Sequence, residues 1–79
     1  MTREQFYVVL FIISEGVITQ IAERRRLTHE QASKMFFNSI VYAHLEVEET
    51  KTWHYSKYLL ADLFEDELNG TLVWSEVSL

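Results

Sequence analysis

Apolar residues recur at helical spacing through the first third of the chain. One stripe, with steps of three or four residues, runs through Phe6, Val9, Leu10, Ile13, Val17 and Ile21. This spacing is typical of one face of an α-helix. Thr2 and Gln5 fit a capping box at its start, and the triplet Arg24-Arg25-Arg26 suits the negative end of the helix dipole. A buried strand over residues 6–13 is the alternative, because β-branched and aromatic residues are frequent there.

Similar signals predict further helices downstream. Thr28 and Gln31 form a second capping box, and Asn38-Ser39 could break the helix that follows and leave a short third helix at 40–45. Ser56 can cap a last helix that stops at Asn69-Gly70. We expect one helix to turn inward Ala32, Met35, Phe36, Ser39 and Ile40. We expect the last one to turn inward Leu59, Leu60, Leu63, Phe64 and Leu68.

The segments between and after these helices are polar or alternating. Residues 46–52 are predicted to form a loop. Trp53 is expected to pack onto the core and hold residues 46–56 in place, because a large aromatic side chain in a polar segment usually has a burial site. Residues 71–79 alternate like a short strand or an extended arm. Together these patterns predict an all-α fold, a small bundle of three to four helices with an extended C-terminal tail, as one domain over residues 1–79.

Composition narrows the class further. A chain of 79 residues without Pro and with two Gly is one small domain and does not suit a turn-rich β fold. It has no Cys, which excludes disulfides and thiolate metal sites. A zinc site would need His44, His54 and a carboxylate such as Glu48 to meet, and ordinary histidines explain the pattern better. No nucleophile or phosphate loop is recognisable, so we expect neither an enzyme nor a metal or cofactor.

Negative charge gathers in the second half of the chain. The formal net charge is −5, and residues 41–79 hold two basic and eight acidic side chains. In the last helix, Asp62, Glu65 and Asp66 face outward, where solubility alone could explain them. The sharper interpretation is a docking surface for a basic protein partner, following electrostatic complementarity.

A second candidate surface lies on the apolar start of the first helix. Val8 and Ile12 share their face with the polar residues of the helix, so one stripe in a monomer cannot bury them. Together with Tyr7 and Phe11 they would form an exposed apolar patch of the kind that marks an interface. A symmetric homodimer would pair the patch with its own copy. In the alternative, the tail folds back and covers it with Leu72, Val73, Trp74 and Val77.

The arginine triplet before a capped helix also fits a helix-turn-helix over residues 24–38. A small DNA-binding regulator is therefore the alternative function. Lys34 is the one Lys or Arg of its recognition helix, and the domain is acidic, so binding to nucleic acid is disfavoured. The first apolar run is also too short for a membrane span, which needs ~20 residues, and it lacks the features of a signal peptide. The sequence predicts a soluble, cytoplasmic protein without membrane contact.

Several short motifs carry a resemblance. They are Leu27-Thr28 with Ala32 and Phe36, Glu48-Glu49-Thr50-Lys51-x-Trp53-His54, Ser56-x-Tyr58-Leu59 and Leu63-Phe64. Over about residues 18–68 the chain resembles small uncharacterised bacterial helical proteins of unknown function, in which Pro follows the serine where Lys57 stands here. Some similar proteins lie beside toxin-like genes, which implies an antitoxin-like or accessory role. We therefore expect a non-catalytic helical protein that acts by protein–protein interaction.

Overall fold

The computed structural model describes residues 2–72, and its regular structure there is entirely helical. The elements in order are α1 (Arg3–Arg25), α2 (His29–Phe37), α3 (Ile40–Leu45), η1 (Glu48–Thr50), η2 (Thr52–His54) and α4 (Lys57–Leu68), of which η1 and η2 are 3-10 turns. No strand occurs within residues 2–72, so the all-α class is confirmed and the strand alternative for 6–13 is wrong. The expected tail lies, from residue 73 on, outside the described residues.

Local hydrogen bonds set where the helices begin. In the first capping box, Gln5 N donates to Thr2 Oγ1 at 3.1 Å and Thr2 N donates to Gln5 Oε1 at 2.9 Å. The same reciprocal pair joins Thr28 and Gln31 at the start of α2. Ser39 caps α3 through Tyr42 N, and Ser56 caps α4 through Leu59 N. Each cap satisfies an amide that has no partner within its helix, so these short signals fix the element boundaries.

The end of α1 is a left-handed turn at Arg26. Arg26 has φ 56° and ψ 46°, and the next amide, Leu27 N, donates to Ala22 O at 2.9 Å. This is the hydrogen-bond pattern of a Schellman motif, in which glycine is the usual residue at the left-handed position. An arginine there carries a steric cost that glycine avoids.

Replacing Arg26 by glycine should therefore stabilise the protein. We expect a gain of about 0.5–1 kcal/mol in the free energy of unfolding, because the Cβ strain of the left-handed turn disappears. Glu23→Gly is the matched control, since Glu23 is exposed in the right-handed part of the same turn and should lose about 1 kcal/mol. Urea unfolding followed by circular dichroism measures both. A loss at Arg26→Gly equal to the loss at Glu23→Gly would contradict the left-handed cap.

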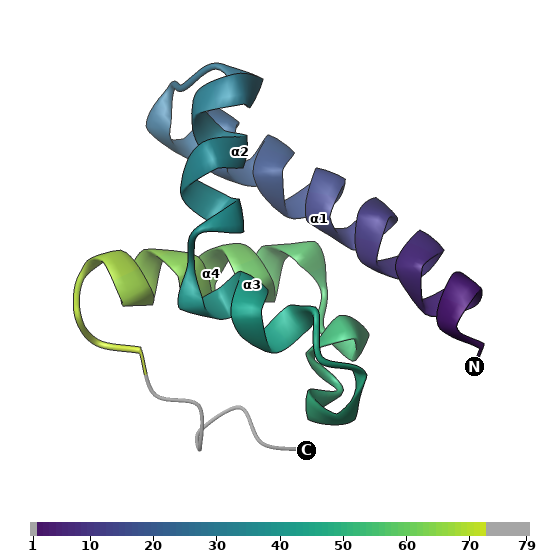
Figure 1. The fold of residues 1–79 in the computed structure, drawn as a ribbon. Coiled ribbons are helices and arrows are strands. Elements are labelled where there is room, and N and C mark those ends of the chain that lie inside the picture. The colour runs from purple at the N-terminus through teal and green to yellow at the C-terminus, as the bar shows by residue number, and fades with distance from the viewer. Residues whose placement is uncertain (1, 73–79) are drawn as a thin grey trace.

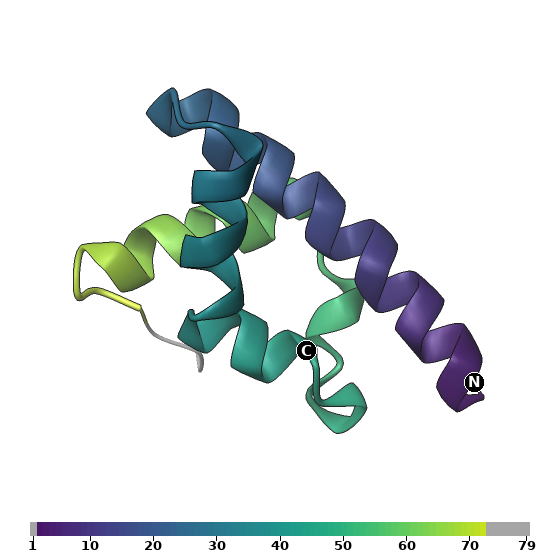
Figure 2. The same cartoon turned by 45° about the horizontal axis from the view of Figure 1, so that its top comes forward.

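The other helices pack around the C-terminal half of α1. Figures 1 and 2 show α1 as a long diagonal element, with α2 and α4 beside its second half and its first turns reaching outward at the N-terminus. Contacts join α1 to both α2 and α4, and α3 to α4. The longest dimension of the molecule, 35 Å, is close to the length of about 1.5 Å per residue that a helix of 23 residues has. The centre of the core is formed by Val17, Ile18, Ile21, Ala32, Phe36, Val41, Leu45, Leu60, Ala61 and Phe64.

The close approach of α1 and α4 uses the missing side chain of Gly16. A Cβ built at Gly16 would lie 3.1 Å from Lys57 Cδ and 3.4 Å from Lys57 Cβ. The aliphatic stem of Lys57, at the first position of α4, thus lies directly against α1. This explains a glycine in the middle of a helix, where it costs about 1 kcal/mol relative to alanine.

Two side chains expected to face inward do not. Ile40 is 53% exposed and Leu68 is 43% exposed. The helix breaks at Asn38-Ser39, so the inward face of the restarted α3 passes through Val41 and Leu45 instead of continuing the stripe of α2. Leu68 is the last residue of α4, beyond the part of the helix that the core covers.

The loop expected at 46–52 consists largely of the turns η1 and η2. Trp53 follows as part of η2, is half-buried and packs against the core cluster. Its indole Nε1 donates to Glu48 O at 2.9 Å, which joins η2 to η1. The expectation that Trp53 packs onto the core is confirmed.

Candidate interaction surface

The expected apolar patch on α1 is present on the surface. Tyr7, Val8, Phe11 and Ile12 are 57%, 58%, 67% and 62% exposed, and no other four large apolar side chains of residues 2–72 lie so close together in the sequence with such exposure. They occupy positions i, i+1, i+4 and i+5, so they form two adjacent rows on one side of the helix. We call these four residues the α1 patch.

The patch is exposed because a different face of α1 packs against the core. Phe6, Leu10, Ser14 and Val17 are buried, so this row defines the inward side. At 100° per residue, Val8 and Ile12 lie nearly opposite Leu10. Tyr7 and Phe11 lie between these two faces. No described element lies far enough around the first half of α1 to cover the outer rows (Figure 1).

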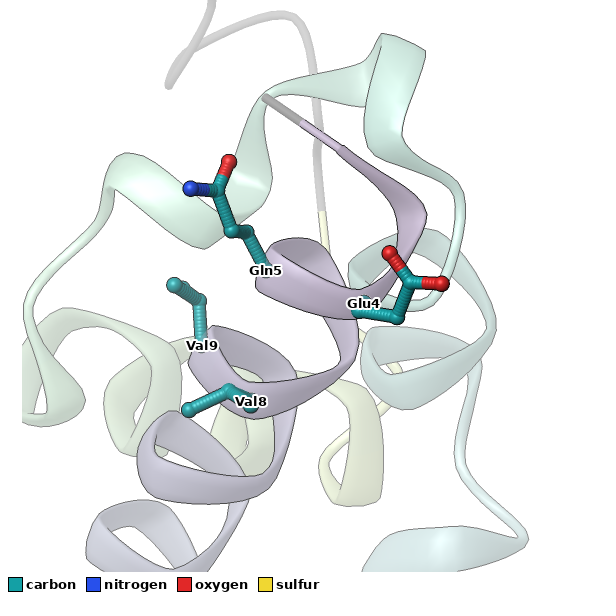
Figure 3. Close-up of a pocket in the computed structure, with 4 residues that line it drawn as sticks. All are labelled: Glu4, Gln5, Val8 and Val9. Carbon is teal, nitrogen blue, oxygen red and sulfur yellow. The ribbon is translucent and has the colours of Figure 1, made fainter.

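A shallow hollow adjoins the patch near the N-terminus. Figure 3 shows its lining, Glu4, Gln5, Val8 and Val9, and all four side chains belong to α1. In this view Gln5 and Val9 lie on the same side of the helix, one turn apart. Among the residues that the structure describes, this lining comes from a single helix. Val8, which belongs to the α1 patch, is thus also part of the hollow.

The composition of α1 also meets a simple criterion for a membrane-spanning helix. The helix is long and apolar enough to cross a bilayer, and 33% of its most apolar 18-residue window is buried inside the domain. A core helix of a soluble protein and a signal sequence meet the same criterion. The apolar run 6–13 alone is too short, but the helix that contains it is not.

The acidic residues of α4 divide into paired and unpaired groups. Arg24 Nη1 donates to Asp62 Oδ1 at 2.7 Å. Arg25 holds Glu65 with two hydrogen bonds, 2.7 and 3.0 Å long, which raise the pKa of its guanidinium against the opposing effect of desolvation. Asp66 is exposed. Asp62 and Glu65 thus bind arginines of their own chain. A basic partner that docked on this surface would have to compete with Arg24 and Arg25 for these two carboxylates.

A third carboxylate of α4 has a structural role that sequence reasoning missed. Glu67 accepts from Ile40 N at 2.9 Å and from Val41 N at 3.0 Å. These are the first amides of α3, where negative charge is favourable. The acidic end of α4 therefore caps a second helix across the fold. Negative charge is unfavourable at the C-terminus of a helix. The capping of α3 by Glu67 explains why at least this carboxylate lies at the C-terminus of α4.

The arginine triplet is similarly engaged. Residues 24–38 contain four Lys or Arg side chains, and three of them, Arg24, Arg25 and Lys34, form ion pairs with acidic residues. These pairs are partly or fully exposed and contribute about 0–1 kcal/mol each to stability. They also reduce the positive charge that a helix-turn-helix at 24–38 could present to phosphates.

The histidines are spread over the structure. His29 Nε2 lies 3.1 Å from Glu15 Oε2, on the surface between α1 and α2. His54 stacks on the indole of Trp53 with 3.9 Å between ring centroids. Within residues 2–72, no three His, Cys, Asp or Glu side chains are grouped so that they could hold a metal ion.

Comparison of the chain with protein-family models, with curated proteins and with solved structures found no match. The geometry of the α1 patch, the paired carboxylates of α4 and the charges around them therefore carry the functional argument.

Proposed function

We propose that the protein is a non-catalytic helical bundle that acts by protein–protein contact through the α1 patch. The observation that carries this proposal is the exposure of four large apolar side chains in two adjacent rows, Tyr7, Val8, Phe11 and Ile12. Exposed apolar patches on small soluble domains commonly mark interaction sites. The simplest partner is a second copy, which would pair the two patches about a two-fold axis.

The energetics favour a concentration-dependent dimer. Burying the exposed parts of these four side chains contributes roughly 4–7 kcal/mol per copy, from 1.5–3 kcal/mol for each complete burial. Association costs an estimated 4–15 kcal/mol in lost motion. The two contributions are of similar size, so the dimer should be of moderate strength. Adjacent surface, such as the hollow beside Val8 and Val9, would add to it.

The double substitution Val8→Glu with Ile12→Lys tests this proposal. It places two charges in the middle of the interface, and we expect it to convert a dimer into a folded monomer. Both positions are more than half exposed, so the fold should remain intact. Light scattering over a range of protein concentrations gives the mass, and circular dichroism reports the fold.

Leu68→Lys is the matched control, because Leu68 is an exposed apolar residue at the far end of α4 (Figure 1). It should leave the mass unchanged. Wild-type protein that stays monomeric at high concentration contradicts the homodimer, and so does a double variant that remains dimeric.

The cellular setting follows as part of the same proposal. In a cytoplasmic protein, the second half of α1 stays in the domain core with Val17, Ile18 and Ile21, which are fully buried. Moving α1 into a bilayer would expose the partners of these side chains to water. An antitoxin-like or accessory role, as the resemblance implies, would use the α1 patch to contact a second protein.

A further inference from the structure

A groove lies between the first half of α1 and the junction of α2 with α3. Its walls carry four aromatic rings, Tyr7 and Phe11 on α1, Phe37 at the end of α2 and Tyr42 on α3. Leu10 and Ser14, the buried members of the lining, form its floor, and Glu15 completes it. Its volume is about 190 Å³. An apolar cavity of roughly 150 Å³ is known to bind benzene, so the groove has room for one aromatic ring.

The floor of the groove contains a polar group without a partner. Ser14 is 4% exposed, and its Oγ makes no hydrogen bond within the described part of the chain. Helical serine and threonine often donate to the carbonyl four residues earlier, as Thr19 Oγ1 does to Glu15 O at 2.9 Å. A buried hydroxyl without a partner costs stability. A ligand that brings a hydroxyl or a ring N–H into the groove would remove this cost.

Carboxylates lie at the groove and in a neighbouring hollow. Glu15 lies on its rim, although His29 contacts this carboxylate. On the other side of Tyr7, a second hollow is lined by Arg3 and by three carboxylates, Glu46, Glu48 and Glu49. Burial is the main cause that raises the pKa of the Tyr42 phenol, and the negative charge of Glu46 is the second, so the Glu46 carboxylate acts on this aromatic wall. These carboxylates, unlike Asp62 and Glu65, have no Lys or Arg ion pair among the described residues.

We propose that this aromatic groove is a docking site for one tyrosine or tryptophan side chain carried on a lysine- or arginine-rich segment of a partner protein. The ring packs among the four aromatic walls, its polar atom bonds Ser14 Oγ, and the flanking cations meet Glu15 and the three carboxylates beyond Tyr7. This inference rests on the proposed function, because it assigns partner chemistry to the inner edge of the α1 patch. Tyrosine and tryptophan are the side chains that most often anchor such contacts.

Titration of the full-length, isotope-labelled protein with short peptides tests the inference. The probe is acetyl-Lys-Lys-Ala-Tyr-Ala-Lys-Lys-amide, with twins that carry Phe or Ala in place of Tyr and a twin with Glu in place of every Lys. We expect the Tyr peptide to shift the amide resonances of Ser14, Phe37 and Tyr42. The Ala twin should bind at least tenfold more weakly. The Phe twin should bind about threefold to tenfold more weakly, which is the usual range for one hydrogen bond.

Variants of the protein locate the effect. In Ser14→Ala, the Tyr and Phe peptides should bind equally, while the fold persists because the change removes an unpartnered hydroxyl. Phe37→Ala, which removes an exposed wall, should weaken the Tyr peptide about tenfold. Ile40→Ala is its matched control, since Ile40 is similarly exposed and does not line the groove. Equal binding of the Tyr and Ala peptides, no binding of either, or equal binding of the Lys and Glu peptides overturns the inference.

Three further outcomes separate the inference from its rivals. If Trp74→Ala makes the full chain bind the Tyr peptide tenfold more tightly, the chain's own C-terminal segment occupies the groove, and the partner assignment is overturned. A wild-type monomer that binds the Tyr peptide contradicts the homodimer and supports the groove. A wild-type dimer that ignores every peptide overturns the groove and leaves the homodimer standing.

Discussion

Phe36→Ala should remove most of the stability of this protein. Phe36 has no exposed surface, and its ring lies 6.3 Å from that of Phe64 and 5.5 Å from that of Tyr42, centroid to centroid. It therefore joins α2, α3 and α4. Truncating a buried phenylalanine costs about 3–5 kcal/mol. At about 0.05–0.15 kcal/mol per residue, a domain of 79 residues has roughly 4–12 kcal/mol in total.

We expect a free energy of unfolding lower by about 3–5 kcal/mol, measured by urea denaturation. The melting temperature should fall by about 12–40 °C, because each kcal/mol shifts it by roughly 4–8 °C in a domain of this size. The protein concentration has to be the same for all variants, since self-association would add to the apparent stability.

The adjacent residue supplies the control. Phe37 is 47% exposed, and its ring contacts those of Phe36 and Tyr42 from the surface, so Phe37→Ala should cost about 1 kcal/mol or less. The two variants remove the same atoms one position apart. A cost at Phe36 as small as the cost at Phe37 would show that the core does not centre on Phe36.

The helix boundaries could be predicted because their signals are local. A threonine three residues before a glutamine specifies both capping boxes, and Ser56 and Gly70 mark the limits of α4. Gly70 has φ 74°, the left-handed conformation for which glycine is selected. Such hydrogen bonds span three to five residues, so a pattern along the chain contains all of the information that they need.

Contacts between distant segments could not be predicted in this way. Two such contacts are the pair of hydrogen bonds from Arg25 to Glu65 and the capping of α3 by Glu67. The residues that they join are separated by between 26 and 40 positions in the sequence. They depend on how α1 and α3 approach α4, which periodicity does not encode. Composition suggested an acidic docking face at Asp62 and Glu65, whereas the fold uses these carboxylates to hold α1.

The two candidate surfaces also differ in whether they depend on local patterns or on contacts between distant segments. The α1 patch was predictable, because the positions of Val8 and Ile12 opposite Leu10 follow from helical periodicity alone. The aromatic groove was not, because Phe37 and Tyr42 reach it only through the break at Asn38-Ser39. The one signal in the sequence was Ser14, a polar residue on the face of α1 that the core buries. The sequence alone does not show that the hydroxyl of Ser14 has no hydrogen-bond partner within the described residues.

Trp53→Ala should produce the second large effect, about 3 kcal/mol, on the scale for loss of a packed aromatic side chain. The indole lies edge-on to Phe6, with 6.3 Å between ring centroids, and stacks on His54. Its Nε1 also donates to Glu48 O at 2.9 Å. One side chain thus joins η1, η2 and the first turns of α1, and its removal should loosen all three.

Urea unfolding measures the total loss, and hydrogen exchange locates it. In Trp53→Ala, the amides of Lys51, His54 and Tyr55, which close the turns η1 and η2, should exchange faster while those of the α2 interior remain protected. Trp53→Phe is the matched control, because it keeps the ring against Phe6 and loses the donor to Glu48, at a cost of about 0.5–1.5 kcal/mol. A loss below about 1 kcal/mol in Trp53→Ala, the range of surface substitutions, would contradict the packing of Trp53 on the core. The indole would then be available as an anchor for a partner beside the carboxylates of η1.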